Sequence, residues 1–200
     1  MDVARAVPTA LEKHAAVRGV RLVGSRASGR AHEVSDWDFL VHTDDFEAVA
    51  ADLPRLVASL EPLSELWDPY SDRACYMLML RGPTKIDLIF PREKRKWSGP
   101  WEPRRDTLAD IDRHFWDWIL WLEQKRRRGR TAQLEKSLGD MYRLLLRPLG
   151  VVDEPASVAD AVPAYVDARD ALERRFGVEL SRELEREVRP VVASQGRGRP

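Results

Sequence analysis

Two aspartates, separated by one residue, are the first candidates for chemistry in this sequence. Asp36 and Asp38 lie in a run that has the composition of a β-strand. Side chains at i and i+2 of a strand share a face, which places these Cβ atoms roughly 7 Å apart. Trp37, Phe39 and Val41 then form the opposite, apolar face. Neighbouring carboxylates repel each other, and a bound divalent cation is the commonest compensation, so the pair predicts a metal site.

A Gly-Ser turn precedes the two acids, and a third aspartate follows them in a later apolar run. Gly24 and Ser25 come directly after the short predicted strand 20–23. Small residues let a backbone approach a phosphate, and the free N–H groups of a helix start attract anions. Asp87 lies within the strand-like run 85–90, which alternates polar and apolar residues. These residue types suit a phosphate at the turn and a metal ion at the acids.

The order and spacing of these residues resemble the signature of the DNA polymerase β-like nucleotidyltransferase superfamily. The resemblance covers about residues 20–90 and rests on Gly24, Ser25, Asp36, Asp38 and Asp87. It implies that the turn holds a nucleoside triphosphate and that the three acids are catalytic residues that bind two Mg²⁺ ions. It also implies that Asp87 reaches the site from a neighbouring strand, as a metal ligand or as the base for an attacking hydroxyl.

Composition restricts the partners that we expect. The 200 residues hold 33 basic and 33 acidic side chains, so no net charge favours nucleic acid or an anionic membrane. No run of about 18 apolar residues predicts a membrane span. The single Cys75 lies in an apolar run and gives no disulfide framework. We therefore expect a cytoplasmic protein without nucleic-acid or membrane partners, either monomer or homodimer.

The elements that position these residues follow from hydrophobic periodicity. In the first half we expect a helix over 8–18 that opens near Pro8, and a helix over 46–60 that is kinked or divided at Pro54. Besides the strands that carry the acids, we expect a short strand near Trp67 and a strand over 74–80 that forms a hairpin with 85–90.

After Phe90 the composition changes to a proline-rich, basic linker or active-site loop over 91–105. Helical periodicity follows. We expect one helix from a capping box at Thr107 to Gly129, a second from Thr131, and further helices over 164–176 and 178–192. The fold class is therefore α+β: a nucleotidyltransferase half with a small mixed sheet over 1–100, an all-helical bundle over 101–194, and a disordered basic tail over 195–200.

This order of halves resembles the small bacterial nucleotidyltransferases that transfer AMP from ATP to a hydroxyl of an aminoglycoside or lincosamide antibiotic. The resemblance implies that Lys136 and Arg143 help to bind the nucleotide. Arg26, next to the turn, is a further candidate for nucleotide binding, with a solvated side chain as the ordinary alternative. The resemblance also implies that helical-half acids bind amines of the acceptor, with Asp140 first among the candidates Asp110, Asp112, Asp117, Glu123 and Asp140. An ion pair between Lys136 and Asp140 is the ordinary alternative.

Two other functions stay open. An antitoxin-like enzyme would adenylylate a partner protein, but such enzymes are usually shorter and lack a large helical half. A nucleotide-binding or interaction module without turnover would not need the three acids. A polymerase is disfavoured because the chain lacks a continuous basic stripe with interleaved aromatic residues.

Overall fold

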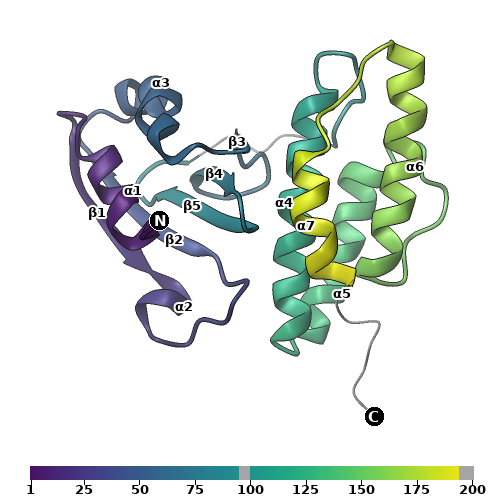
Figure 1. Cartoon of the computed structure of the whole chain (residues 1–200), viewed down its shortest axis with the longest axis horizontal. Helices are drawn as coiled ribbons and strands as arrows, with labels where there is room; N and C mark the ends of the chain where they lie inside the picture. Colours follow the sequence, from purple (N-terminus) through teal and green to yellow (C-terminus); the bar gives the residue numbers. More distant parts are fainter. Residues whose placement is uncertain (95–99, 194–200) are drawn as a thin grey trace. The chain divides into compact units, whose positions relative to one another are not determined.

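The computed structural model describes residues 1–94 and 100–193, and the predicted tail at 195–200 lies outside them. The chain divides into two compact units, residues 1–97 and 98–200, which we describe separately (Figure 1). None of the described helices is long and apolar enough to cross a membrane.

The first unit is built on a mixed five-stranded sheet with the order β1-β2-β5-β4-β3. The strands are β1 (Val17–Val23), β2 (Trp37–Thr43), β3 (Ser64–Trp67), β4 (Ala74–Leu80) and β5 (Thr84–Phe90). Strand β2 is antiparallel to β1 and parallel to β5, while β4 is antiparallel to both β5 and β3. The prediction of a small mixed sheet is confirmed, and the two acid-bearing strands are neighbours.

Three helices accompany the sheet: α1 (Val3–Leu11), the single turn α2 (Gly24–Ala27) and α3 (Phe46–Val57), which continues as the 3₁₀ turn η1 (Ala58–Leu60) (Figure 1). Apolar residues of α1 and α3 join the inward faces of β2 and β5 in one core. Phe39 and Val41 on β2, and Ile86 and Leu88 on β5, are at most 1% exposed. The alternation of the sequence therefore fixes which face of each acid-bearing strand is buried.

Pro8 misled the prediction of the first helix. This helix begins at Val3 rather than near residue 8, and Pro8 lies inside it. Val3, Val7 and Leu11 recur at a spacing of four and are buried, and this apolar stripe outweighs the lost hydrogen bond. The predicted helix over 46–60 matches α3 together with η1, and Pro54 lies within α3.

Two strand bounds also differ from the prediction. Strand β1 begins at Val17 rather than at residue 20, so no helix reaches residue 18. Strand β2 begins at Trp37, which leaves Asp36 in the loop immediately before it rather than on the strand itself.

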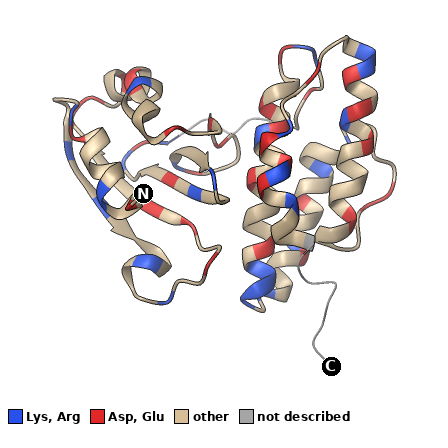
Figure 2. Cartoon of the chain, viewed as in Figure 1, with Lys and Arg blue, Asp and Glu red and all other residues tan. Residues whose placement is uncertain are grey.

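The second unit is all-helical, as predicted. It contains α4 (Leu108–Arg127), α5 (Thr131–Met141), which continues as the π-helical turn η2 (Tyr142–Leu146), α6 (Val158–Phe176) and α7 (Glu183–Ala193) (Figure 1). Helix α4 buries an apolar stripe of Leu108, Ile111, Phe115, Ile119 and Leu122, and the ring of Phe115 stacks on that of Tyr165 with centroids 3.6 Å apart. Acidic and basic residues are interspersed along the helices (Figure 2).

The starts of α4 and α5 match the prediction, whereas those of α6 and α7 differ. Helix α4 begins directly after Thr107, but the Thr107 side chain does not form the predicted cap. Its hydroxyl donates instead to the carbonyl oxygen of Glu102 at 2.6 Å. Helix α6 begins at Val158 rather than at residue 164. The Ser157 hydroxyl accepts from the Asp160 N–H at 3.2 Å, and this N-cap sets the start, with Pro163 inside the helix. The last helix begins at Glu183 rather than at residue 178.

Candidate active site

The three predicted acids meet at one end of the pair β2 and β5. Asp38 and Asp87 are register partners on these parallel strands, and Asp36 directly precedes β2. One carboxylate oxygen from each residue lies within 4.8 Å of the other two. Strands in a sheet are about 4.8 Å apart, so this register places the two strand acids side by side. Asp36 is 9% exposed, and Asp38 and Asp87 are half-buried.

The donor set fits a hard divalent cation. Mg²⁺ prefers oxygen ligands, keeps several waters and is typically bound through one or two carboxylates together with substrate phosphates. Oxygens within 4.8 Å of one another are close enough to share an ion, or to bridge two ions about 3.5–4 Å apart. The cluster is also partly exposed, so water and a substrate can reach it.

Gly24 lies directly against the acids. It adopts φ +70°, a left-handed conformation that side chains disfavour, at the start of the turn α2. A Cβ at this position would stand 2.2 Å from Asp38 Oδ2, which leaves no room for a side chain. The neighbouring Ser25 is half-buried, and its carbonyl oxygen accepts from the Arg30 N–H at 2.9 Å. The predicted Gly-Ser turn and the acid pair therefore form one site.

Arg26 anchors the loop that contains Asp36. Its Nε and Nη2 donate to the carbonyl oxygen of Ser35 at 3.0 and 2.7 Å, and its guanidinium lies 4.1 Å from the ring centroid of Trp37. Burial lowers the pKa of Arg26, while the charge of Asp36 opposes that shift. The side chain thus anchors the segment before β2, and the expected phosphate contact stays a prediction.

Lys85 is a site residue that the sequence reasoning missed. It lies on β5 with a side chain only 3% exposed, and its ammonium donates a hydrogen bond to Asp87 Oδ1. The i, i+2 spacing of Lys85 and Asp87 was a usable signal, because it places both side chains on one face of the strand.

Lys136, Asp140 and Arg143, the predicted site residues of the helical half, lie along α5 and its π-helical turn. Lys136 is exposed, and Asp140 forms an ion pair with Arg143. Their contact with a nucleotide or an acceptor stays a prediction.

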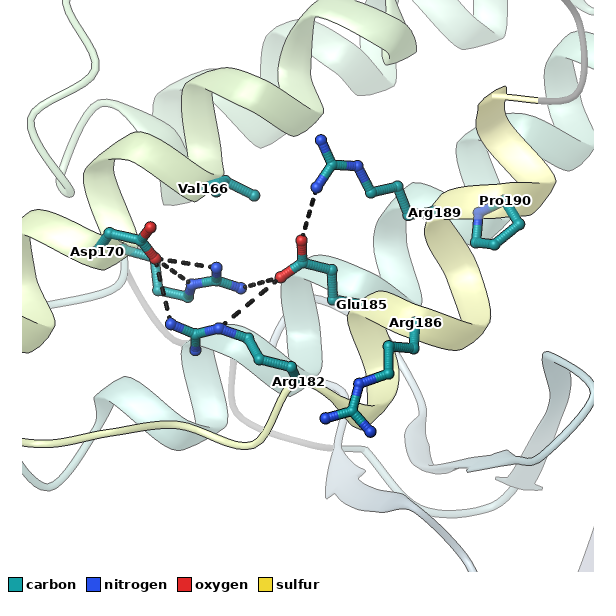
Figure 3. A pocket seen from close by; sticks show the side chains of 8 residues that line it. Val166, Asp170, Arg182, Glu185, Arg186, Arg189 and Pro190 are labelled. Atoms are coloured by element: carbon teal, nitrogen blue, oxygen red, sulfur yellow. Dashed lines mark hydrogen bonds and ion pairs between the residues drawn. The ribbon is translucent and has the colours of Figure 1, made fainter.

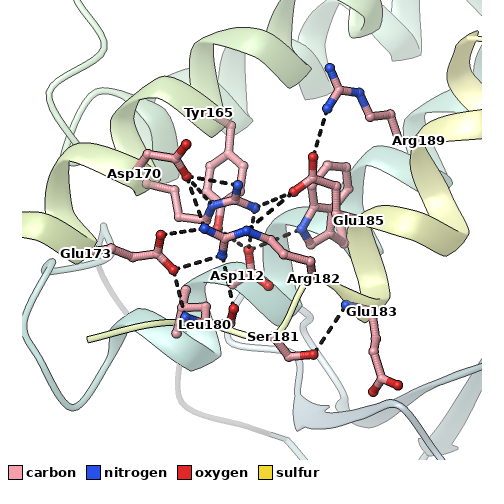
Figure 4. Close-up of polar contacts among 12 residues, drawn as sticks. Asp112, Tyr165, Asp170, Glu173, Leu180, Ser181, Arg182, Glu183, Glu185 and Arg189 are labelled. Carbon is pink, nitrogen blue, oxygen red and sulfur yellow. Dashed lines mark hydrogen bonds and ion pairs between the residues drawn. The ribbon is translucent and has the colours of Figure 1, made fainter. Parts of the chain in front are cut away.

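The other candidate acids of the helical half are largely engaged within it, and Figure 4 shows this for Asp112. The Asp112 carboxylate accepts from the Tyr165 hydroxyl at 2.7 Å and from the Trp116 indole at 3.1 Å. Burial raises the pKa of Asp112. Glu123, 1% exposed, accepts hydrogen bonds from two arginines at 2.7 Å, and Asp110 pairs with Arg113. Asp117 is also buried. Asp112, Asp117 and Glu123 are therefore buried within the bundle, whereas Asp110, like Asp140, pairs with a partly exposed arginine three residues later.

A cavity of about 700 Å³ lies between α6 and α7, and no motif in the sequence predicts it (Figure 3). It is lined by Val166, Arg169, Asp170, Arg182, Glu185, Arg186, Arg189 and Pro190. Arg169, 2% exposed, donates to Glu185 at 2.8 Å and to Asp170 at 2.9 Å. Arg182 contacts Glu173 and Asp170 (Figure 4). This charged network joins the two helices.

Comparison with known proteins identifies a family and several similar solved structures. A family model described as a nucleotidyltransferase domain matches residues 4–111. No curated protein matches the chain. An aminoglycoside 6-adenyltransferase from Bacillus subtilis aligns with 10% identity over 95% of this chain and 97% of its own, at a TM-score of 0.38. A cytoplasmic RNA terminal U-transferase aligns with 18% identity over 44% of this chain, at a TM-score of 0.37, and the match spans 27% of that protein.

Proposed function

Because the chain belongs to the nucleotidyltransferase domain family, whose model covers residues 4–111 of 200, we propose that it transfers a nucleoside monophosphate to a hydroxyl acceptor. Family membership confirms the predicted family and the prediction of an enzyme. The observation that carries the proposed reaction is the meeting of Asp36, Asp38 and Asp87 within 4.8 Å.

The proposed metal is Mg²⁺, with two ions in the working site. Asp36 and Asp38 would hold them, and Asp87 would complete the set from β5. When bound, the ions supply stabilisation of the attacking and leaving oxygens of an in-line displacement at the α-phosphate. The acids themselves fix the ions relative to the strands, which orients the substrate groups without further rearrangement.

We propose ATP as the nucleotide, bound beside the acids at Gly24 and Ser25. The absence of a side chain at Gly24 leaves its backbone open next to Asp38. Small residues in such a turn let phosphate oxygens approach the main chain. Arg26, Lys136 and Arg143 are proposed as the cationic residues that offset the charge of the triphosphate.

We propose a small-molecule acceptor that resembles an aminoglycoside, with antibiotic modification as the biological role in the cytoplasm. Asp140 is the proposed contact for an acceptor amine, since its carboxylate pairs with an exposed arginine rather than with the buried network. No nucleic acid or membrane takes part in this reaction, and the enzyme would act as a monomer or homodimer.

The test is transfer of α-phosphate-labelled ATP, with Mg²⁺, to a panel of aminoglycosides and lincosamides and, separately, to host-lysate protein. The double variant Asp36→Asn, Asp38→Asn is the control. Label on a small molecule, lost in the variant, supports the proposal. Label on one protein band instead supports an enzyme that adenylylates a partner protein. No label and no Mg-ATP binding would overturn the proposal in favour of a module without turnover.

A further inference from the structure

The ammonium of Lys85 is a buried positive charge inside the acid cluster. Its side chain is 3% exposed, and Asp87, its hydrogen-bond partner, is 14% exposed. Transfer of an ammonium from water into a protein interior costs several kcal/mol unless a counter-charge is at hand. The Asp87 carboxylate supplies that counter-charge, so the third acid of the cluster serves two cations: the lysine that the chain provides and any metal ion that binds.

The formal charge of the cluster follows from these contacts. Three carboxylates carry three negative charges, and Lys85 cancels one, which leaves two. Two negative charges match one divalent cation, whereas two divalent cations would leave an excess positive charge. The positive charge of Arg26 also acts on Asp36, and this further reduces the negative charge that a metal ion would neutralise. The free protein therefore holds less negative charge than its acids alone indicate.

From this contact we propose that Lys85 is a resident counter-ion that weakens divalent-cation binding in the free protein. The inference rests on the proposed function, because it concerns the loading of the same site. Lys85 acts through Asp87 as a positioning residue: its ammonium fixes Oδ1 and leaves the other carboxylate oxygen for a ligand role. A bound triphosphate brings negative charge of its own, so complete metal loading accompanies nucleotide binding rather than preceding it.

A purely structural lysine is the alternative, and charge-matched variants separate the two. Lys85→Met removes the charge and keeps an unbranched apolar stem. Lys85→Arg keeps the charge beside Asp87. Lys13→Met makes the same change of net charge at an exposed position of the first unit. Only a charge close to the acids affects metal affinity strongly, because the Coulomb energy between charges falls with distance and with solvent screening.

The experiment is a titration of the full chain with Mn²⁺, without nucleotide, followed by electron paramagnetic resonance of the free ion. We expect Lys85→Met to bind the first ion roughly tenfold more tightly than the wild type. Lys85→Arg and Lys13→Met keep the wild-type affinity. With a non-hydrolysable ATP analogue present, the difference between Lys85→Met and the wild type shrinks.

Equal or weaker Mn²⁺ binding by a folded Lys85→Met variant would overturn the inference while leaving the proposed function intact. No Mn²⁺ binding by the wild type or any variant would overturn the metal site itself, and both proposals with it. Circular dichroism and thermal unfolding establish whether each variant folds. If Lys85→Met does not fold, Lys85→Gln makes the same change of charge with a polar group beside Asp87, and the same tightening is expected.

Discussion

A β-carbon on Gly24 would stand 2.2 Å from Asp38 Oδ2, so the turn and the acid cluster cannot be altered independently. Gly24→Ala must displace either the turn or the carboxylate. We expect a loss of turnover of roughly 100-fold or more, since misplacement by about 1 Å costs that much. The measurement is the rate of nucleotidyl transfer together with thermal unfolding.

Gly29 offers the matched control for this change. It has nearly the same backbone conformation, with φ +68° against +70°, but nothing lies within 4 Å of its Cβ position. Both alanine variants therefore pay a backbone cost of about 1–2 kcal/mol. Full activity of Gly24→Ala would contradict the inference that the site requires the close approach of Gly24 to Asp38. An equal loss of turnover in Gly24→Ala and Gly29→Ala would contradict it as well.

Removal of the charges of Asp36 and Asp38 is expected to abolish metal-dependent nucleotide binding without loss of the fold. The carboxylates repel each other within the cluster, and their replacement by Asn relieves that repulsion. Thermal unfolding without metal should show an unchanged or slightly raised midpoint, by about 2–4 °C for each 1 kcal/mol gained. Isothermal titration with Mg-ATP checks binding. The exposed Asp72→Asn is the control and should bind as the wild type does.

Asp87→Asn should lower the free energy of unfolding, in contrast to the substitutions at Asp36 and Asp38. The change leaves the buried ammonium of Lys85 without its carboxylate, and removal of one partner from a buried pair costs about 3–5 kcal/mol. Urea unfolding of Asp87→Asn and of Asp38→Asn tests whether the two substitutions change the free energy of unfolding in opposite directions. Turnover should also fall much further than nucleotide binding does. A variant as stable and as active as the wild type would rule out both the ion pair and a catalytic role.

The network in the second unit gives a prediction for pH. Hydrogen bonds from Arg182 hold the pKa of Glu173 below its usual value. A carboxyl whose pKa is lowered by folding contributes stability above its unfolded pKa, about 4.3, and this stability is lost as the pH falls through the folded pKa. Glu173→Gln should therefore lower the free energy of unfolding by about 1–3 kcal/mol at pH 7.

This difference from the wild type should shrink as the pH falls from about 4.3 through the lowered pKa of the folded carboxyl, where the wild-type side chain also becomes protonated. Urea unfolding at pH 7 and pH 3 measures it. The exposed Glu179→Gln is the control, with little effect expected at either pH. A penalty for Glu173→Gln that is the same at both pH values would show that the side chain stabilises by packing rather than by charge.

The sequence predicted the acids well because their positions obey local rules. Alternation along two short runs placed Asp38 and Asp87 on strands with apolar opposite faces, and the register confirms that they are neighbours. The contact between Lys85 and Asp87 was missed because spacing along a strand says nothing about burial. Whether a lysine is exposed depends on what packs over its face of the sheet.

The errors at helix bounds have a different cause. Pro8 was interpreted as a helix start, and the helix near Pro163 was predicted to begin only at residue 164, yet both prolines lie inside helices. The loss of one backbone hydrogen bond is a local cost, which the apolar stripe of α1 outweighs. The cap at Ser157 sets an earlier start for α6. The balance between the cost of a proline inside a helix and the stabilisation of that helix depends on tertiary packing, which single residues do not reveal.

The parallel pairing of β2 with β5 has a consequence for how the protein matures. The segment between these strands contains α3, β3 and β4, so the third acid reaches the other two only after a long loop has closed. A growing chain that has not yet produced β5 carries Asp36 and Asp38 alone. The cluster of three acids is therefore completed late in synthesis, when β5 pairs with β2.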